Sequence, residues 1–250
     1  MGTLALPRMA LDALVRRFGY RLSVIDPHVQ FEPQHQAIID RVRPFTMTSP
    51  ERIAATCQAV DYVTKYGIPG DFVECGVWRG GNTMAAALSY LRAAVANLPA
   101  LYLFDTFEGM SAPTKVDRKV QSGESAAALV ERFDHVKAYA PIDDVRRNVQ
   151  STGYPGDLIK FVRGKVEETI PAAAPAQIAV LRLDTDWYES TKHELEHLFP
   201  RLSVGGVLII DDYGDWAGAR KAVDEYFAVN RTPMLLTRTD YTGRVGAKLT

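Results

Sequence analysis

Apolar and polar positions alternate along most of this chain with periods that predict helices and strands in turn. Residues 48–51 (TSPE) are typical of a helix start, with Pro at an early position and Glu three residues after Thr. Ile53, Cys57 and Val60 then recur on one face, and Gly67 is a stop signal. The pattern predicts an amphipathic helix between these two signals.

Five short apolar runs predict β-strands, each followed by a turn or a helical segment. The runs are DFVECG (71–76), LYLFD (101–105), LIKFVRG (158–164), QIAVLRLD (177–184) and GGVLIIDD (205–212). Helices are expected between and after them, the strongest by propensity at 82–98. PMLLTR (233–238) and GRVGAKLT (243–250) predict a closing antiparallel hairpin. Repeated β-then-α units indicate an α/β fold with a doubly wound, mainly parallel sheet.

No repeat or linker divides the chain, so we expect one domain over residues 1–250. Residues 1–45 are expected to form a helical N-terminal segment. The stretch 106–156 is polar, mixed in sign and partly helical, which predicts an insertion lying as a lid over one end of the sheet.

Carboxylates are concentrated where the predicted strands end. Ligands of such sheets bind beyond the carboxyl ends of the strands, so chemistry is expected there. The residues at these positions are Glu74, Cys75, Gly76, Asp105, Gly164, Asp184, Asp211 and Asp212.

The turn after the first strand, ECGVWRGG, suggests a nucleotide ligand but departs from the dinucleotide fingerprint. That fingerprint needs a second glycine where Trp78 stands, and an indole there would obstruct a pyrophosphate. This position disfavours an NAD-dependent oxidoreductase, and no P-loop motif occurs.

S-adenosylmethionine, which has a ribose and an amino acid but no pyrophosphate, fits the turn better. Asp105 can accept two hydrogen bonds from a ribose diol. Glu74 and the amides of Gly80, Gly81 and Asn82 can hold the ammonium and the carboxylate at a helix N-terminus. The alternative is that Gly76, Gly80 and Gly81 only permit a tight turn. A non-catalytic protein that binds this cofactor is also compatible with the turn.

Asp184, Asp211 and Asp212 end two strands that are expected to be neighbours. Three converging carboxylates repel one another unless a cation lies between them, and oxygen ligands select a hard ion such as Mg²⁺ or Ca²⁺. Such a cation can bind neighbouring substrate hydroxyls and lower the pKa of one, and a carboxylate can take the proton. The alternative role for Asp212, or for nearby Asp186, is to cap a helix.

HELEH at 193–197 matches the H-E-x-x-H zinc motif, but its context argues against a metallopeptidase. The helix stops at Pro200, and the other three histidines lie far upstream. We therefore expect His193 and His197 to face solvent.

Composition narrows the function classes further. The 250 residues carry 29 Lys and Arg against 30 Asp and Glu, a net charge of −1 that gives no general attraction to nucleic acid. Two cysteines, Cys57 and Cys75, do not form a disulfide framework, which favours a reducing compartment. The first residues do not resemble a secretory signal, and no apolar run approaches the roughly 20 residues of a membrane span. A soluble, cytoplasmic protein is expected.

The chain resembles the TylF-type macrocin O-methyltransferase family, which methylates sugar hydroxyls on macrolides, aminocoumarins and related natural products. The resemblance rests on five segments between Pro69 and Phe227: PGDFVECGVWRGG, LYLFDTFEGM, FVRGKVEETIP, IAVLRLDTDWYEST and LFPRLSVGGVLIIDDYGDWAGARKAVDEYF. It implies a class I S-adenosylmethionine-dependent fold, Mg²⁺ as metal and commonly a homodimer.

Residue roles also follow from the resemblance. The metal ligands match Asp184, Asp211 and Asp212, with Asp184 as the base. The cofactor site matches Met47, Gly164 and Asp105 for the ribose, together with the loop Glu74–Thr83, which contains Gly76, Gly80, Gly81, Asn82 and Thr83. The acceptor is expected to be a glycosylated small molecule, whose identity the variable lid leaves open. Glu32 and His35 are candidates either for touching it or for a plain surface role.

Overall fold

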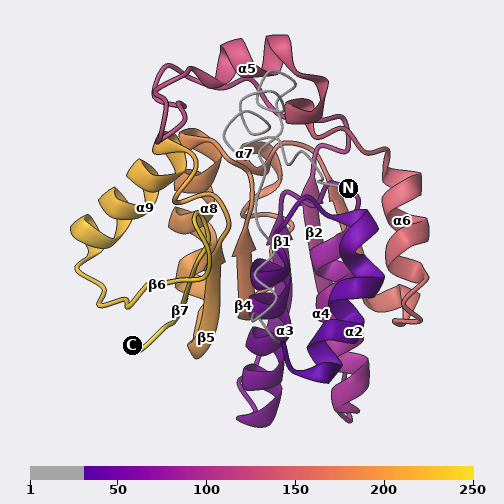
Figure 1. Cartoon of the computed structure of the whole chain (residues 1–250). Helices are drawn as coiled ribbons and strands as arrows, with labels where there is room; N and C mark the ends of the chain where they lie inside the picture. Colours follow the sequence, from indigo (N-terminus) through magenta and orange to yellow (C-terminus); the bar gives the residue numbers. More distant parts are fainter. Residues whose placement is uncertain (1–30) are drawn as a thin grey trace, which may run out of the picture. The chain divides into compact units, whose positions relative to one another are not determined.

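One seven-stranded sheet forms the centre of the computed structural model, which describes residues 31–250. The strand order is β3-β2-β1-β4-β5-β7-β6 (Figure 1). The strands are β1 (Asp71–Cys75), β2 (Leu101–Asp105), β3 (Ile159–Arg163), β4 (Ile178–Leu183), β5 (Leu202–Ile210), β6 (Thr237–Arg238) and β7 (Arg244–Ala247). The first five strands are parallel, whereas β7 runs antiparallel to both β5 and β6. The predicted α/β fold with a parallel sheet and a C-terminal hairpin is confirmed.

Helices cover both faces of this sheet (Figure 1). One layer contains α2 (Pro33–Val42), α3 (Pro50–Lys65), α4 (Gly81–Ala93) and α6 (Ile142–Gln150), and the other α7 (Val166–Thr169), α8 (Tyr188–Leu198) and α9 (Ala217–Asn230). The remaining helical elements are α5 (Ala126–Arg132), η1 (Arg43–Phe45), η2 (Asp134–Lys137), η3 (Gly156–Leu158) and η4 (Phe199–Arg201).

Helix α3 forms where the sequence places its start signal. The side chain of Ser49 accepts a hydrogen bond from the backbone N–H of Arg52, and Pro50 occupies the first turn, where its missing N–H costs nothing. Ile53, Cys57 and Val60 are completely buried, so the predicted apolar face packs into the core. The segment directly before this helix, residues 46–48, lies at the carboxyl edge of the sheet, where it lines the pocket.

The middle of the chain divides into two parts. Residues 106–141, which include α5 and η2, contribute to the pocket at the carboxyl ends of the strands. Helix α6 instead lies in the helical layer beside α4, where Val145 and Val149 contact the region of Gly80. The portion of the predicted insertion that overlies the strand ends is therefore shorter than 106–156.

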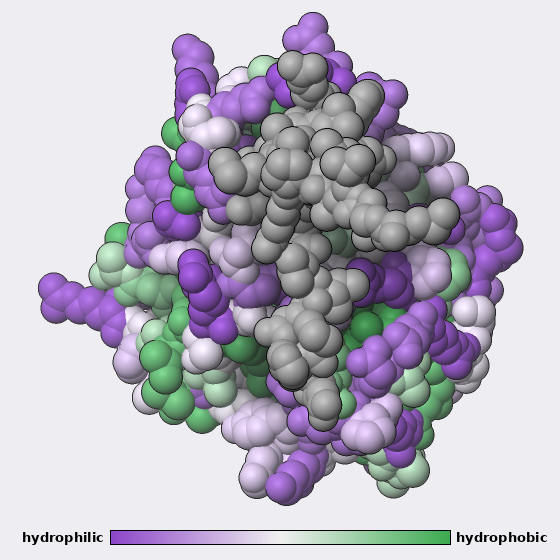
Figure 2. Space-filling model, in the orientation of Figure 1, coloured by the Kyte–Doolittle hydropathy of each residue, from purple (hydrophilic) through white to green (hydrophobic). Residues whose placement is uncertain are grey.

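The surface in the view of Figure 2 is largely hydrophilic, with hydrophobic side chains gathered on the side of β6, β7 and α9. Exposed hydrophobic residues belonging to this part of the chain are Val229, Leu235, Tyr241 and Leu249. Among residues 31–250, no helix combines the length and apolar character that crossing a membrane requires.

Candidate active site

A pocket of about 290 Å³ opens at the carboxyl ends of the parallel strands. The ends of β1, β2, β4 and β5, residues 46–48 and the segment 106–141 all contribute to its wall. Of the predicted site residues it is lined by Met47, Glu74, Gly76, Asn82, Asp105, Gly164, Asp184, Asp211 and Asp212. Gly80, Gly81 and Thr83 lie in the adjoining turn and first turn of α4.

The turn between β1 and α4 requires a close approach of backbone to backbone. Gly76 has φ +79°, and a Cβ at this position would collide with the carbonyl oxygen of Asp184. Trp78, at the position where the dinucleotide fingerprint needs glycine, also has a positive φ of +45°. A left-handed backbone at a bulky residue is uncommon, and such conformations persist where the surrounding structure holds them.

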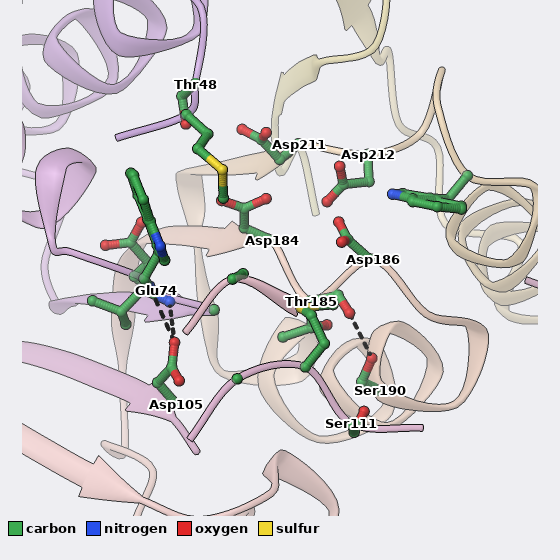
Figure 3. Close-up of a pocket in the computed structure, with 18 of the residues that line it drawn as sticks. Thr48, Glu74, Asp105, Ser111, Asp184, Thr185, Asp186, Ser190, Asp211 and Asp212 are labelled. Carbon is green, nitrogen blue, oxygen red and sulfur yellow. Dashed lines mark hydrogen bonds between the residues drawn. The ribbon is translucent and has the colours of Figure 1, made fainter. Parts of the chain in front are cut away.

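Asp105 holds this turn in place. Its Oδ2 accepts hydrogen bonds from the backbone N–H groups of Val77 (2.6 Å) and Trp78 (3.1 Å) (Figure 3). Its Oδ1 accepts a hydrogen bond from Phe107 N–H (2.7 Å). Burial raises the pKa of Asp105, whereas these hydrogen bonds lower it. The carboxylate is half-buried and lines the pocket, so it both shapes the turn and faces the ligand space.

Glu74 lines the pocket but is almost completely buried, and both of its carboxylate oxygens have partners within the protein. It accepts a hydrogen bond from Arg182 Nη1 at 2.6 Å and another from the hydroxyl of Thr83. Burial raises its pKa, and Arg182 opposes that shift. These contacts give Thr83 and Glu74 a role in holding β1 against α4.

Residues 46–48 cross the N-terminus of α4. The Asn82 side chain donates to Thr48 Oγ1 (2.8 Å) and to Thr46 Oγ1 (3.3 Å). Gly81 permits this crossing, because a Cβ there would lie 2.7 Å from the carbonyl oxygen of Phe45. Met47, between the two threonines, is 54% exposed and lines the pocket.

Three aspartates from two neighbouring strand ends present carboxylate oxygens to one another. One oxygen each from Asp184, Asp186 and Asp212 lies within 4.8 Å of the other two. Figure 3 shows these groups gathered on one side of the pocket, with Asp105 on the opposite side. Asp212 Oδ2 is buried and has no hydrogen-bond partner within residues 31–250, so this oxygen can act as a ligand of a cation.

Crowding of these carboxylates changes their acidity. Burial raises the pKa of Asp184 and of Asp212 well above the ordinary range, and the neighbouring aspartates reinforce both shifts. The pKa of Asp186 rises to about 7 through burial, with Asp184 adding to the shift. All the donor atoms of this group are carboxylate oxygens, and their negative charges are unfavourable without a positive partner. Such a set of ligands fits a hard divalent cation.

Asp211 lies beside this group but is shared between two arginines. Its carboxylate is 3% exposed and contacts both Arg52 and Arg182. Arg182 also contacts Asp184 Oδ2 at 2.7 Å, and Arg52 Nε contacts Asp240 Oδ2 at 3.0 Å. The predicted trio is thus close in space, with Asp184 and Asp212 converging on Asp186 and Asp211 turned toward cationic side chains.

Three functional residues escape the sequence patterns. Asp186 converges on Asp184 and Asp212 and does not cap α8, whose N-cap residue is Trp187; only its spacing of two from Asp184 hinted at this position. Arg182 could have been suspected because a lone arginine interrupts an otherwise apolar strand. Nothing in the sequence near Arg52 distinguishes it from an ordinary surface residue of a helix.

The remaining histidine predictions differ from the structure in part. His35 is buried, 3% exposed, and its Nε2 lies 2.8 Å from Asp61 Oδ2, so it has neither a surface position nor one in the pocket. His193 and His197 are half-buried instead of solvent-facing, because their rings pack against each other and His193 Nε2 lies 3.0 Å from the Ile170 carbonyl. Neither joins a metal-binding group among residues 31–250, and Glu194 is buried with its side chain on Thr185. Glu32 remains untested as a substrate contact.

The strand order, the antiparallel β7 and a pocket at the carboxyl edge define this protein as a class I methyltransferase in fold. The sequence profile of the macrocin O-methyltransferase (TylF) family matches residues 22–246. The chain belongs to this family and is an O-methyltransferase. The resemblance expected from the sequence motifs is confirmed.

Individual relatives are also O-methyltransferases. A Streptomyces olivaceus 8-demethyl-8-(2,3-dimethoxy-α-L-rhamnosyl)-tetracenomycin-C 4′-O-methyltransferase is 38% identical over 185 residues, 72% of this chain and 67% of that protein. Demethyldecarbamoylnovobiocin O-methyltransferase of Streptomyces niveus is 36% identical, covering 73% of this chain and 68% of that protein.

Solved structures show the same fold. The O-methyltransferase NovP superposes with a TM-score of 0.71 at 33% identity, over 82% of this chain and 83% of that one. The calicheamicin methyltransferase CalS11 superposes with a TM-score of 0.64 at 20% identity, over 90% of this chain and 99% of that one.

Proposed function

We propose that this enzyme transfers a methyl group from S-adenosylmethionine to a hydroxyl of a sugar carried by a small molecule, with Mg²⁺ as metal. The observation that carries the proposal is the convergence of aspartates at the strand ends of a TylF-family fold. Relatives at 36–38% identity are named for methylation of a rhamnosyl tetracenomycin and of a novobiocin precursor, which supports a glycoside acceptor.

The metal site comprises Asp184, Asp211 and Asp212, with Asp186 beside them. The unpartnered Oδ2 of Asp212 supports this assignment. Asp211 contacts Arg52 and Arg182, so its participation requires it to turn away from at least one of them. When bound, Mg²⁺ supplies positive charge that lowers the pKa of a substrate hydroxyl.

The residues in the other half of the pocket would hold the cofactor. When bound, S-adenosylmethionine supplies an electrophilic methyl group. Asp105 would accept a hydrogen bond from the ribose, the amides of Gly81 and Asn82 would hold the carboxylate, and Gly76, Gly164 and Met47 would shape the surrounding walls. The Gly80 amide cannot share in this task, because it donates to the Val77 carbonyl at 2.9 Å, and the Thr83 hydroxyl acts through Glu74. The buried pairing of Glu74 makes it a support of this loop, with contact to the ammonium group as its second role.

Asp184 takes the proton of the acceptor hydroxyl. The deprotonated oxygen would then be the nucleophile for the methyl group that the bound cofactor would supply, with the carbon–sulfur bond electrons returning to sulfur. Burial keeps the pKa of Asp184 high enough for a carboxylate to hold a proton, and Arg182 orients it through Oδ2. Asp186, with a pKa raised to about 7, is the other carboxylate within reach of the same space.

A labelled-methyl assay tests the proposal. Purified protein is incubated with methyl-labelled S-adenosylmethionine and a panel of deoxysugar glycosides and their aglycones, with Mg²⁺ or with excess EDTA. We expect label in glycosides only, and loss of transfer in EDTA that added Mg²⁺ restores. Transfer to aglycones would refute the acceptor class, and undiminished transfer in EDTA would refute the metal.

A homodimer and a cytoplasmic location remain predictions. Sedimentation of the purified protein at several concentrations measures the first, and fractionation of the producing cells measures the second. Residues 106–141 are proposed to cover the acceptor, since they line the pocket opposite the cofactor turn.

A further inference from the structure

Asp117 is a completely buried aspartate that takes no direct part in the proposed chemistry. It lies in the segment between β2 and α5, is 0% exposed and does not line the pocket. Its Oδ2 accepts hydrogen bonds from the backbone N–H (2.6 Å) and hydroxyl (2.8 Å) of Thr114. A buried carboxylate costs free energy unless its oxygens are satisfied, so its partners identify what it does.

The other oxygen of Asp117 reaches across 71 positions of sequence to the turn that follows β4. Oδ1 accepts a hydrogen bond from the backbone N–H of Tyr188 at 2.8 Å. Tyr188 is the first residue of α8, whose own N-cap residue, Trp187, gives no side-chain cap. Asp117 therefore supplies from outside the negative acceptor that the exposed donors of this helix start need.

The turn that Asp117 caps carries two of the converging carboxylates. Asp184 and Asp186 immediately precede α8, and Asp186 has φ +66°, a conformation that needs support from its surroundings. The same segment holds the next residue as well, because Trp187 Nε1 donates to the carbonyl of Ser111 at 2.9 Å. The hydrogen bonds of the Trp187 side chain and of the Tyr188 backbone N–H thus fix the path of this turn.

Residues 118–120 of the same segment also contact the turn that follows β5 and carries Asp211 and Asp212. Val120 N–H donates to the Asp215 carbonyl (2.8 Å), and the Arg118 carbonyl accepts from Ala217 N–H (2.8 Å). The Lys119 ammonium pairs with the Asp215 carboxylate and lies 3.9 Å above the Trp216 ring. Asp215 N–H in turn donates to the Asp212 carbonyl at 3.0 Å.

Residues 111–120 therefore contact both the turn that carries Asp184 and Asp186 and the turn that follows Asp211 and Asp212. We propose that Asp117 is a positioning residue that sets the spacing of these two turns, and with it the cation affinity of the aspartate cluster. This inference rests on the metal site of the proposed function. Gly218 packs against the same carboxylate, since a Cβ there would collide with Asp117 Oδ1. We call Asp117, its donor Thr114 and Gly218 the clamp.

The test compares Asp117→Asn and Gly218→Ala, which disturb the clamp from opposite sides. Asp134→Asn is the matched control, because Asp134 belongs to the same part of the chain and its side chain is 94% exposed. Binding of Mn²⁺ alone is measured by electron paramagnetic resonance, and binding of S-adenosylhomocysteine alone by calorimetry. Thermal melting checks that each variant is folded.

We expect both clamp variants to weaken Mn²⁺ binding by about tenfold, as loss of outer contacts to metal ligands does. S-adenosylhomocysteine affinity should stay within about twofold of wild type, because none of the proposed cofactor residues lies between residues 111 and 120 or in the two aspartate-bearing turns. Mn²⁺ affinity unchanged in both variants, or equal weakening for both ligands, overturns the inference. If Asp117→Asn does not fold, Thr114→Val removes one donor to the same carboxylate, and an Mn²⁺ affinity equal to wild type then overturns it.

The wild-type protein separates the two possible failures. No Mn²⁺ binding by folded wild-type protein overturns the proposed metal site itself. If the wild type binds Mn²⁺ and the clamp variants bind it equally well, the metal site stands and only the role of Asp117 is overturned.

Discussion

At the scale of single residues, the carboxylates of this site differ in their partners. Asp105 accepts hydrogen bonds from backbone N–H groups, and Glu74 and Asp211 form ion pairs with arginines. Asp212 has one buried oxygen without a partner within residues 31–250. Carboxylates of the same type thus acquire different tasks from their surroundings. The first two predictions separate these tasks by mutation.

Asp211→Asn should reduce methyl transfer by about 100-fold or more, because it removes a negative ligand from the metal site. Cofactor affinity should remain measurable and within about threefold of wild type, since Asp211 lies across the pocket from Asp105. Rates come from the labelled-methyl assay and affinities from calorimetry. Wild-type turnover in this variant would remove Asp211 from the metal site and leave it as an arginine partner.

Asp105→Ala should weaken S-adenosylmethionine binding by about tenfold or more, because a charged acceptor for the ribose and for three backbone N–H groups is lost. Calorimetry measures the affinity. Asp143→Asn, on the exposed side of α6, is the control and should bind as wild type does. An unchanged affinity in Asp105→Ala would contradict the ribose assignment.

At the scale of elements, close packing of a loop over a helix start decides where glycine is required. Residues 46–48 cross the first turn of α4, held by Asn82, and the crossing leaves no room for a side chain at Gly81. Ala is normally the better residue in a helix, so the local preference and the tertiary contact act in opposite directions here.

Gly81→Ala should destabilise the protein by about 1–3 kcal/mol, because the new Cβ would lie 2.6 Å from Thr46 Cβ and 2.7 Å from the Phe45 carbonyl oxygen. Urea unfolding measures the free energy. Gly156→Ala is the matched control, since nothing lies within 4 Å of a Cβ there and its stability should change by less than about 1 kcal/mol. Equal effects of the two changes would contradict the close crossing.

At the scale of the whole molecule, the sheet brings negative charge together at one edge of a chain with a net charge of −1. Asp184, Asp186 and Asp212 all have raised pKa values, chiefly through burial, and Asp184 adds to the shift of Asp186 whereas Asp186 adds to that of Asp212. Folding therefore favours their protonated forms, and the free energy of unfolding depends on pH.

The metal-free protein should lose stability as pH rises. Asp186 has a pKa near 3.8 ordinarily and about 7 when folded, so between these values the folded state binds more protons and each increase in pH favours unfolding. Melting temperatures in EDTA should fall from about pH 5.5 to about pH 8, and Mg²⁺ should reduce that slope by stabilising the charged carboxylates. Identical slopes with and without Mg²⁺ would contradict a cation at this cluster.

Much of this architecture was predictable because it depends on local patterns. Apolar runs predicted β1 to β4 to within one residue at each end, whereas β5 begins at Leu202, three residues before its predicted start. The start signal of α3 lies where Ser49 caps it. Helix α4 was predicted to reach residue 98 but ends at Ala93, with Ala94 left-handed, because the chain must reverse before β2. Propensity alone does not include that requirement.

The sequence by itself determined the strands, the family and the acids at the strand ends, because hydrophobic periodicity and ordered motifs are written in neighbouring residues. Only the tertiary structure decided which carboxylates converge, which are paired with Arg52 and Arg182, and that Asp117 holds the turn carrying Asp184 and Asp186. These contacts join residues far apart along the chain, and side-chain direction and burial, which set their charge and acidity, exist only after the chain has folded.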